Sequence, residues 1–433
     1  MRLHTIVFGC QMSFADAEEM SRALAARGFV PAEGLDDADA VLVNTCTVRD
    51  HAEHRAVSQI GRLKQWKDAR PGRLLIVAGC AAQRMGGRLR ERFPHVDLVV
   101  GSASVADFPA IVERALEGRF SWTRRDEAPV AAAGFRPSSP VSARVTVMRG
   151  CARACAYCIV PSVRGPEVCR PLESVLSGVR KAVSTGAKEV VLLGQTVNGW
   201  KDGDLDFADL LRSAAGVEGV ERVRFMSPHP ALLDERTARA MAEVPRICPH
   251  LHLPVQSGSD RVLAAMKRGY TRAEYLRRVE AVRRLVPDLE LTTDALTGFP
   301  GETEEDFRRT LSLLEEAGVC GAYCFKFSPR EGTPAAAMEG AVPKAVVQER
   351  LARLLSTAER LARERLSAWR GRTVEVLLET PVQGRTPQFL AARLDRPGTP
   401  GDIVRAEVLS STAATLRCRL LAGAERLVVE YPR

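Results

Sequence analysis

The sequence lacks any apolar run that could cross a membrane. The longest run, near Leu74–Ala82, is far shorter than the roughly 20 residues that a transmembrane helix needs. A secretory or lipoprotein leader is missing too, because Met1–Cys10 contains a single Arg and the chain turns acidic soon after it. These absences exclude an integral membrane protein and predict a cytoplasmic location.

The composition lacks the extremes that mark disordered, fibrous or collagen-like chains. Of the 433 residues, 45% are hydrophobic and 27% are charged, which is ordinary for globular proteins. No internal repeat is evident. The length predicts two or three domains, because a typical domain has about 150 residues.

Lysine is scarce, and nearly all of the 62 basic residues are Arg. With 53 acidic residues, the formal net charge is +9. Arg pairs with phosphate through two hydrogen bonds, so this balance favours phosphate-rich partners such as nucleic acid. Many soluble enzymes have a similar charge, so the balance alone does not identify the partner.

The first third of the chain alternates predicted strands with predicted helices. Strands are expected over Leu3–Gly9, Val41–Asn44 and Leu74–Gly79, and helices over Ala15–Gly28, His51–Lys67 and Phe108–Leu116. This alternation predicts a doubly wound parallel sheet in an α/β domain of residues 1–120. Residues 121–140 have no periodicity and are predicted to form a linker.

A second series of six predicted strands alternates with helices in residues 141–370. The strands are Val145–Met148, Glu189–Leu193, Val223–Met226, His250–Pro254, Leu289–Thr292 and Gly321–Phe327. Six such units predict an incomplete (βα)6 barrel whose functional side chains lie at the carboxyl ends of the strands. The last helix, Val346–Arg370, is rich in Arg and could present either a solvated charged face or a nucleic-acid-facing surface.

The tail, residues 371–433, changes to short β-rich runs. They are Thr373–Leu378, Ile403–Leu409 and Thr415–Leu421, and Gly and Pro separate them. This pattern predicts a small C-terminal β-barrel.

Eleven cysteines are more than packing needs in a reducing compartment, where disulfides are rare. Cys151, Cys155 and Cys158 lie within eight residues, just after the first predicted strand of the barrel. Three thiolates on one loop can converge on a cubane cluster and leave its fourth iron open to a small molecule. Zinc and a thioredoxin-like pair are the alternatives, although structural zinc usually has four protein ligands.

Three further cysteines share one placement, because each follows a predicted strand of the N-terminal sheet. Cys10, Cys46 and Cys80 are therefore expected at the carboxyl edge of that sheet, where open α/β sheets bind ligands. This placement predicts a second three-thiolate site. The remaining five show no such geometry and are expected to be structural: Cys169, Cys248, Cys320, Cys324 and Cys418.

The cysteine spacing at the start of a partial barrel resembles the radical S-adenosylmethionine (SAM) superfamily, and within it the methylthiotransferases. The C-terminal barrel is similar to the TRAM domain that ends these enzymes. The matching runs are Gly9–Met12, Val43–Arg49, Gly79–Cys80, Gly150–Pro161, Arg164–Gly165, Leu193–Asn198, Leu251–Asp260, Gly298–Thr303 and Gly332–Pro334.

The resemblance implies two four-iron clusters. Cys151, Cys155 and Cys158 would hold the cluster that binds and cleaves SAM, and a second set would hold the auxiliary cluster for sulfur transfer, namely Cys10, Cys46 and Cys80. It also implies a tRNA substrate, an electron donor such as flavodoxin or ferredoxin, proteins that supply sulfur and clusters, and no membrane partner.

Other residues of the barrel are candidates for contacts with SAM or substrate. Tyr157, inside the cysteine loop, can pack near adenine. The others lie at or just past predicted strand ends: Gln195, Asn198, Ser227, Gln256, Ser257 and Asp294. Each could instead be a polar residue that caps a loop.

Three branches of the family share this architecture, and they act on isopentenyl-modified adenosine of tRNA, on threonylcarbamoyladenosine of tRNA, or on an aspartate of a ribosomal protein. The Gln11–Met12, Asn44–Arg49 and Gly194–Asn198 runs look most like the first branch. They imply methylthiolation at carbon 2 of that adenosine, next to the anticodon. Outside the family, the alternatives are an iron–sulfur electron carrier and a zinc-stabilised RNA-binding protein.

Overall fold

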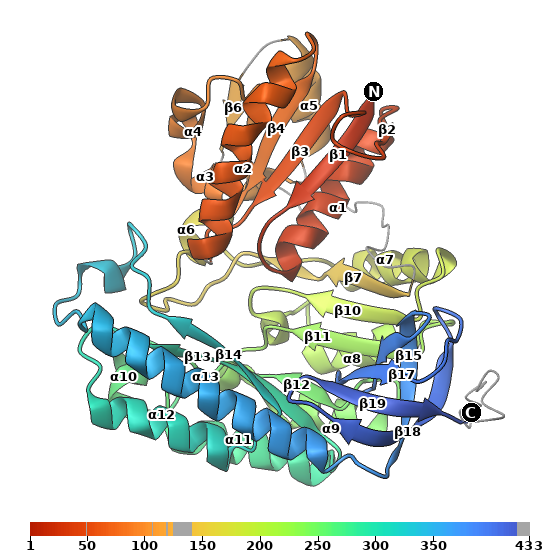
Figure 1. The fold of residues 1–433 in the computed structure, drawn as a ribbon, viewed down its shortest axis with the longest axis vertical. Coiled ribbons are helices and arrows are strands. Elements are labelled where there is room, and N and C mark those ends of the chain that lie inside the picture. Colours follow the sequence, from red (N-terminus) through yellow and green to blue (C-terminus); the bar gives the residue numbers. More distant parts are fainter. Residues whose placement is uncertain (49, 106, 118–119, 124–140, 422–433) are drawn as a thin grey trace.

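The computed structural model describes residues 1–433 except 49, 106, 118–119, 124–140 and 422–433. Its three units are a parallel sheet domain, a partial barrel and a small closed β-barrel (Figure 1). This architecture confirms the predicted fold class. Most of the predicted linker lies outside the described residues, and the predicted domain boundaries stay predictions.

The N-terminal unit is a six-stranded parallel sheet with the order β2-β1-β3-β4-β5-β6. Its strands are β1 (Arg2–Val7), β2 (Val30–Pro31), β3 (Ala40–Thr45), β4 (Leu74–Gly79), β5 (Leu98–Gly101) and β6 (Phe120–Trp122). Its helices are α1 (Gln11–Ala25), α2 (Asp50–Asp68), α3 (Cys80–Met85), α4 (Gly87–Arg92), the 3-10 turn η1 (Ser102–Ser104) and α5 (Phe108–Glu117). Strands β3 and β4 are buried along their whole length, as expected where helices cover both faces of a parallel sheet.

The strand order creates a switch point between β1 and β3. The chain leaves β1 through α1 towards β2 on one side, and then returns to pair β3 with the other side of β1. Open α/β sheets bind ligands outside the carboxyl ends of the strands at such a point. The sequence patterns predicted β1, β3 and β4 but not the short strands β2, β5 and β6.

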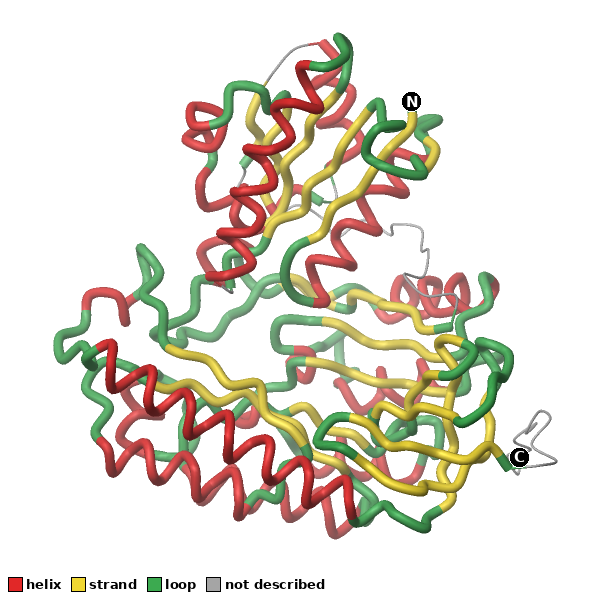
Figure 2. The backbone as a smooth tube through the Cα atoms, in the orientation of Figure 1, coloured by secondary structure: helices red, strands yellow, loops and turns green. Residues whose placement is uncertain are grey.

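Six parallel strands form the partial barrel in two hydrogen-bonded sets, β7-β10-β11 and β12-β13-β14. They are β7 (Ser142–Thr146), β10 (Glu189–Leu193), β11 (Arg222–Met226), β12 (His250–His252), β13 (Glu290–Thr297) and β14 (Gly321–Lys326). Helices α7 (Leu172–Ser184), α8 (Phe207–Ala215), α9 (Glu235–Glu243), α10 (Asp260–Ala265), α11 (Arg272–Leu285), α12 (Glu304–Glu316) and α13 (Lys344–Ser367) accompany them, with 3-10 turns η2 (Val197–Gly199), η3 (Pro230–Leu232) and η4 (Pro334–Ala337). Figure 2 shows these helices on the outside of the strands.

Local sequence explains where several of these helices begin. The side chains of Thr271 and Thr303 each accept a hydrogen bond from the backbone N–H three residues later. The acid at that position, Glu274 or Asp306, accepts a hydrogen bond from the backbone N–H of the threonine. Such capping boxes satisfy backbone donors that the first turn leaves free. One continuous apolar core, including Phe225, then lies between strands and helices.

A short excursion interrupts the barrel after its first strand. Strands β8 (Met148–Arg149) and β9 (Val168–Cys169) pair antiparallel and bring its two ends together, and α6 (Val160–Arg164) lies within it. The two chain segments lie very close together where β8 and β9 pair, because a Cβ on Gly150 would lie 1.7 Å from the Pro166 carbonyl oxygen. Cys169 therefore closes the loop as part of β9.

The C-terminal unit is a closed barrel with the order β15-β16-β17-β19-β18. The strands are β15 (Thr373–Thr380), β16 (Gln383–Arg385), β17 (Ala391–Leu394), β18 (Ile403–Ser411) and β19 (Thr415–Leu420). Arg224 of β11 reaches this unit and donates hydrogen bonds to the carbonyls of Thr386 and Pro387. Within the described chain, no helix has both the length and the apolar character that a membrane span requires.

Candidate active site between the sheet domain and the barrel

The structure brings Cys10, Cys46 and Cys80 together at the carboxyl edge of the N-terminal sheet. Cys10 is the residue before α1, Cys46 directly follows β3, and Cys80 is the first residue of α3. A hydrogen bond from the Cys46 thiol lowers the pKa of Cys10 well below its ordinary value. The hydrogen bond to Cys10, together with burial, raises the pKa of Cys46. This site therefore favours a thiolate at Cys10, the form that binds metals.

Two glycines let these loops approach one another. A Cβ on Gly9 would lie 2.2 Å from Cys46 Cβ, and a Cβ on Gly79 would lie 2.3 Å from the Thr45 carbonyl oxygen. Both glycines also have positive φ angles, +119° and +99°, which side chains disfavour. Any larger residue at these positions would push the cysteine loops apart.

The second cysteine group lies on the loop between β8 and α6. Cys158 N–H donates to the Cys155 carbonyl at 3.1 Å, which folds the loop back on itself. Cys151 Sγ lies 3.1 Å from Thr196 Oγ1, at the carboxyl end of β10. Arg268 donates to Cys155 Sγ at 3.4 Å. Burial raises the pKa of Cys158 to about 12.

The donor chemistry of both groups fits a cluster better than a single ion. A zinc ion draws its thiolates to about 2.3 Å from one centre, whereas a cubane binds each thiolate at a different iron. Each group of three cysteines therefore supplies the kind of donor that a cubane cluster uses.

The barrel mouth beside Cys151 contains polar atoms without protein partners. Both amide atoms of Gln195 are buried and have no hydrogen-bond partner. Ser227 and Gln256 have left-handed backbones, with φ angles of 64° and 73°. Such strained residues cluster at binding sites, so Ser227 and Gln256 stay candidates for ligand contacts, as does Gln195 with its unpartnered amide.

Other candidates have structural partners. Asn198 exchanges hydrogen bonds with the backbone of His229, at 3.1 and 2.7 Å, and so ties the loops after β10 and β11 together. Ser257 is fully buried, with its hydroxyl 3.4 Å from Thr310 Oγ1. These contacts are those of loop-capping residues.

The last two candidates are Asp294, which has a charged or polar neighbour, and Tyr157, which has apolar neighbours. Asp294 lies on β13, with its carboxylate 3.6 Å from His252 Nε2. Tyr157 packs against an apolar group that includes Phe299 of the Gly298–Glu302 turn. Burial raises the pKa of the Tyr157 hydroxyl well above its ordinary value, so it stays protonated.

Sequence reasoning missed Thr196 and Arg268. Thr196 lies beside the predicted Gln195, so the same strand-end argument could have found it. Arg268 is 113 residues from Cys155, and no local pattern connects the two. A buried surface joining the units was also missed: Cys80 packs against Ile159 and Val163, the latter within α6.

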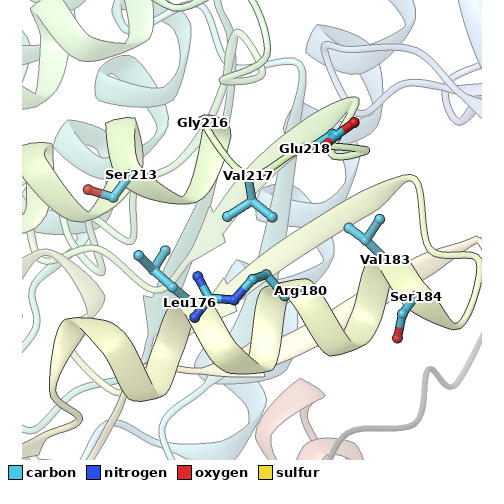
Figure 3. Close-up of a pocket in the computed structure, with 8 residues that line it drawn as sticks. All are labelled: Leu176, Arg180, Val183, Ser184, Ser213, Gly216, Val217 and Glu218. Atoms are coloured by element: carbon cyan, nitrogen blue, oxygen red, sulfur yellow. The ribbon is translucent and has the colours of Figure 1, made fainter.

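A surface pocket lies elsewhere, between α7 and α8 (Figure 3). Leu176, Val183 and Val217 line it, and its Arg180 pairs with Glu173. It faces the outer, helical side of the barrel and includes none of the candidate residues. The pocket is therefore separate from the strand ends.

The arginines of α13 are paired within the protein. Arg360 pairs with Glu315 and Glu364, Arg363 pairs with Glu359, and Arg365 pairs with buried Glu290. These pairs favour the solvated face over the nucleic-acid-facing surface that the sequence also allowed.

Comparison with known proteins agrees with this geometry. The Radical SAM superfamily matches residues 145–314, and a family described as uncharacterized, UPF0004, matches residues 2–101. The tRNA-2-methylthio-N(6)-dimethylallyladenosine synthase of Sorangium cellulosum (strain So ce56) is 40% identical over 98% of this chain and 94% of its own length. The chain belongs to the tRNA-2-methylthio-N(6)-dimethylallyladenosine synthase family. It is therefore a radical SAM methylthiotransferase, and its family implies a 4Fe–4S cluster and SAM as cofactors.

A second relative from this family, in Aquifex aeolicus (strain VF5), is 38% identical over 96% of this chain and 97% of its own length. Among solved structures, the radical SAM methyltransferase TsrM from Kitasatospora setae has a TM-score of 0.58 at 17% identity, over 77% of this chain and 76% of that chain. OxsB, a cobalamin-dependent SAM radical enzyme, has a TM-score of 0.52 at 11% identity, over 83% of this chain and 56% of that chain. These two likenesses concern the fold alone.

Proposed function

We propose that this enzyme transfers a methylthio group to carbon 2 of N6-isopentenyl (dimethylallyl) adenosine, next to the anticodon of tRNA. The observation that carries the proposal is that Cys80 of one three-cysteine site lies in a buried apolar cluster with two residues that follow the other site. Cys80 contacts Ile159, the residue after Cys158, across the boundary between sheet domain and barrel. The activity for which the relatives from Sorangium cellulosum and Aquifex aeolicus are named supports the substrate.

Each cysteine group would hold one 4Fe–4S cluster. Cys151, Cys155 and Cys158 would hold the cluster that binds SAM, and Cys10, Cys46 and Cys80 would hold the auxiliary cluster. When bound, these groups supply the electron, the hydrogen abstraction and the sulfur that the reaction needs. A flavodoxin or ferredoxin would donate the electrons, and sulfur and cluster supply proteins would replenish the sulfur.

The chain's own side chains position these groups. Gln195 offers an unpartnered amide to the polar end of SAM, and Tyr157 packs the cysteine loop against the apolar group around Phe299. Ser227, Gln256 and Asp294 lie at neighbouring strand ends and would contact SAM or the nucleotide. Asn198 and Ser257 would act through the loops that they hold in place.

The test compares three tRNA transcripts with the reconstituted enzyme under reducing conditions. They carry the isopentenyl group, threonylcarbamoyl or no modification at the adenosine, and nucleoside mass spectrometry reads the products. We expect methylthio product from the isopentenyl form only. Equal turnover of the unmodified transcript would overturn the substrate assignment.

Cysteine variants separate the two sites. Replacing Cys151, Cys155 and Cys158 with Ala should halve the iron content and abolish cleavage of SAM. Replacing Cys10, Cys46 and Cys80 with Ala should preserve reductive cleavage and abolish the methylthio product. Loss of both activities in the second variant would contradict a role restricted to sulfur delivery.

A further inference from the structure

A buried ionic cluster joins the two cysteine sites. It consists of Asp16 and Glu19 on α1, and of Arg149, Arg164 and Arg170 in or beside the cysteine loop. Arg164 pairs with Asp16 at 2.7 Å, Arg149 pairs with both acids, and Arg170 pairs with Glu19 at 3.2 Å. All five side chains are at most 13% exposed.

The cluster spans the boundary between sheet domain and barrel. Asp16 lies six positions after Cys10, and Arg164 lies six positions after Cys158. Arg149 precedes Cys151 by two positions. One set of ion pairs therefore connects the segment after Cys10 with both ends of the Cys151–Cys158 loop.

Among these five side chains three arginines face two acids, and Arg22 of α1 also lies near Glu19 and Arg170. Buried charges are costly without a partner. Arg164 has a buried Nη1 without a hydrogen-bond partner, although the same guanidinium bonds Asp16 through Nη2. Asp16 therefore binds only one of the two terminal nitrogens of this guanidinium.

Arg164 lies beside the sheet-domain cysteines although it belongs to the barrel. Its neighbour Val163 packs against Cys80, and the Val163 carbonyl accepts a hydrogen bond from Ser102 Oγ of η1 at 2.6 Å. The Arg164 guanidinium also interacts electrostatically with Cys80 and Cys10, so its positive charge lies near both side chains. The positive charge of Arg164 thus lies beside the sheet-domain cysteines, although Arg164 follows the Cys151–Cys158 loop in the chain.

We propose that Arg164 is a positioning residue that supplies the auxiliary cluster with a buried positive charge across the boundary, and that Asp16 fixes its guanidinium there. This inference rests on the proposed ligand set Cys10, Cys46 and Cys80. A cluster with three thiolates is anionic, and nearby charges and hydrogen bonds set its reduction potential. Arg164 would therefore make the auxiliary cluster easier to reduce.

The test uses the full chain with Cys151, Cys155 and Cys158 replaced by Ala, so that only the auxiliary cluster remains. Into this protein we would introduce Arg164→Gln, Arg164→Lys and, as a matched control, Arg149→Gln. The control also removes a buried arginine that pairs with Asp16, but Arg149 lies on β8, at the opposite end of the Cys151–Cys158 loop from Arg164. Redox titration followed by electron paramagnetic resonance measures the cluster.

We expect Arg164→Gln to move the reduction potential to more negative values, Arg164→Lys to restore part of the shift, and Arg149→Gln to leave it unchanged. If Arg164→Gln alone fails to bind the cluster while the other two bind it, the result also supports the proposal. An unchanged potential in Arg164→Gln, an equal shift in Arg149→Gln, or loss of the cluster in all three variants would overturn it. Absence of a cluster in the parent protein would instead overturn the ligand assignment on which the inference rests.

Discussion

At the scale of single residues, the sheet-domain site depends on positions without side chains. Gly9 and Gly79 allow the chain to turn with positive φ and to pass within contact distance of Thr45 and Cys46. The cysteines give the chemistry, but the glycines set the separation of the three loops. A substitution at either glycine should therefore weaken cluster binding in the sheet domain and leave the fold of the partial barrel intact.

Gly9→Ala tests this point. The added Cβ would overlap Cys46, so we expect the iron content to fall by about half and the methylthio product to be lost, while SAM cleavage persists. Gly72→Ala is the control, because Gly72 has a similar positive φ of +81° but nothing within 4 Å of its Cβ. The control should cost only about 1–2 kcal/mol of stability through backbone strain. Full iron content in Gly9→Ala would show that the loops can separate without loss of the site.

At the scale of secondary structure, the arginines of α13 pair with acidic residues of the protein itself. Its Arg350 is buried and pairs with Glu302, which also accepts a hydrogen bond from Gly298 N–H at 2.8 Å. Arg365 and Trp369 both donate to Glu290 of β13. The helix thus holds the turn after β13 on one side and leads into the C-terminal barrel on the other.

Two arginines of α13 should respond differently to replacement by Gln. Arg363 forms an exposed i,i+4 pair, so Arg363→Gln should change stability by less than about 0.5 kcal/mol and leave tRNA affinity and its salt dependence unchanged. Arg365→Gln leaves the buried Glu290 carboxylate with fewer donors and should cost about 1–3 kcal/mol. Urea unfolding and tRNA filter binding at several salt concentrations provide the measurements. If the tRNA affinity of Arg363→Gln depends less steeply on salt than that of the unaltered protein, α13 contacts the nucleic acid.

At the scale of the whole molecule, Arg224 connects the C-terminal barrel to a buried ion pair of the partial barrel. Arg224 of β11 lies 2.5 Å from Glu189 of β10 and also donates to the backbone of Thr386 and Pro387. Although burial alone would raise the pKa of Glu189, Arg224 keeps it below the ordinary value. A carboxyl with a lowered pKa in the folded state stabilises the fold above its unfolded pKa, and this contribution is lost as the pH falls.

Arg224→Met should therefore leave a buried carboxylate uncompensated and destabilise the protein by about 3–5 kcal/mol. Adding Glu189→Gln removes that charge and should recover part of the loss. The double-mutant cycle is measured by thermal unfolding at neutral pH and near pH 4, where the penalty of Arg224→Met should shrink because Glu189 can take up a proton. Additive effects of the two substitutions would show that Arg224 and Glu189 do not stabilise each other in the folded protein.

The sequence determined the order of elements and the chemistry of the cysteines. Alternating apolar runs predicted β1, β3, β4 and all six barrel strands because buried parallel strands are continuous apolar segments. The spacing of Cys151, Cys155 and Cys158 is local, so no tertiary information was needed to place them on one loop. The strand-end argument also brought Cys10, Cys46 and Cys80 to one edge, because parallel strands end on the same side.

The tertiary structure alone decided which of these groups meet. Arg268 reaches Cys155, Arg164 reaches Asp16 of the sheet domain, and Arg224 reaches the C-terminal barrel, each over a separation along the chain that no periodicity encodes. Short strands such as β2 and β16 were missed because two or three residues have no pattern of their own and form only where a neighbour supplies hydrogen bonds. The role of the α13 arginines could not be predicted from sequence for the same reason. Whether an arginine on a helix faces solvent or pairs within the protein depends on which acids the fold places opposite it.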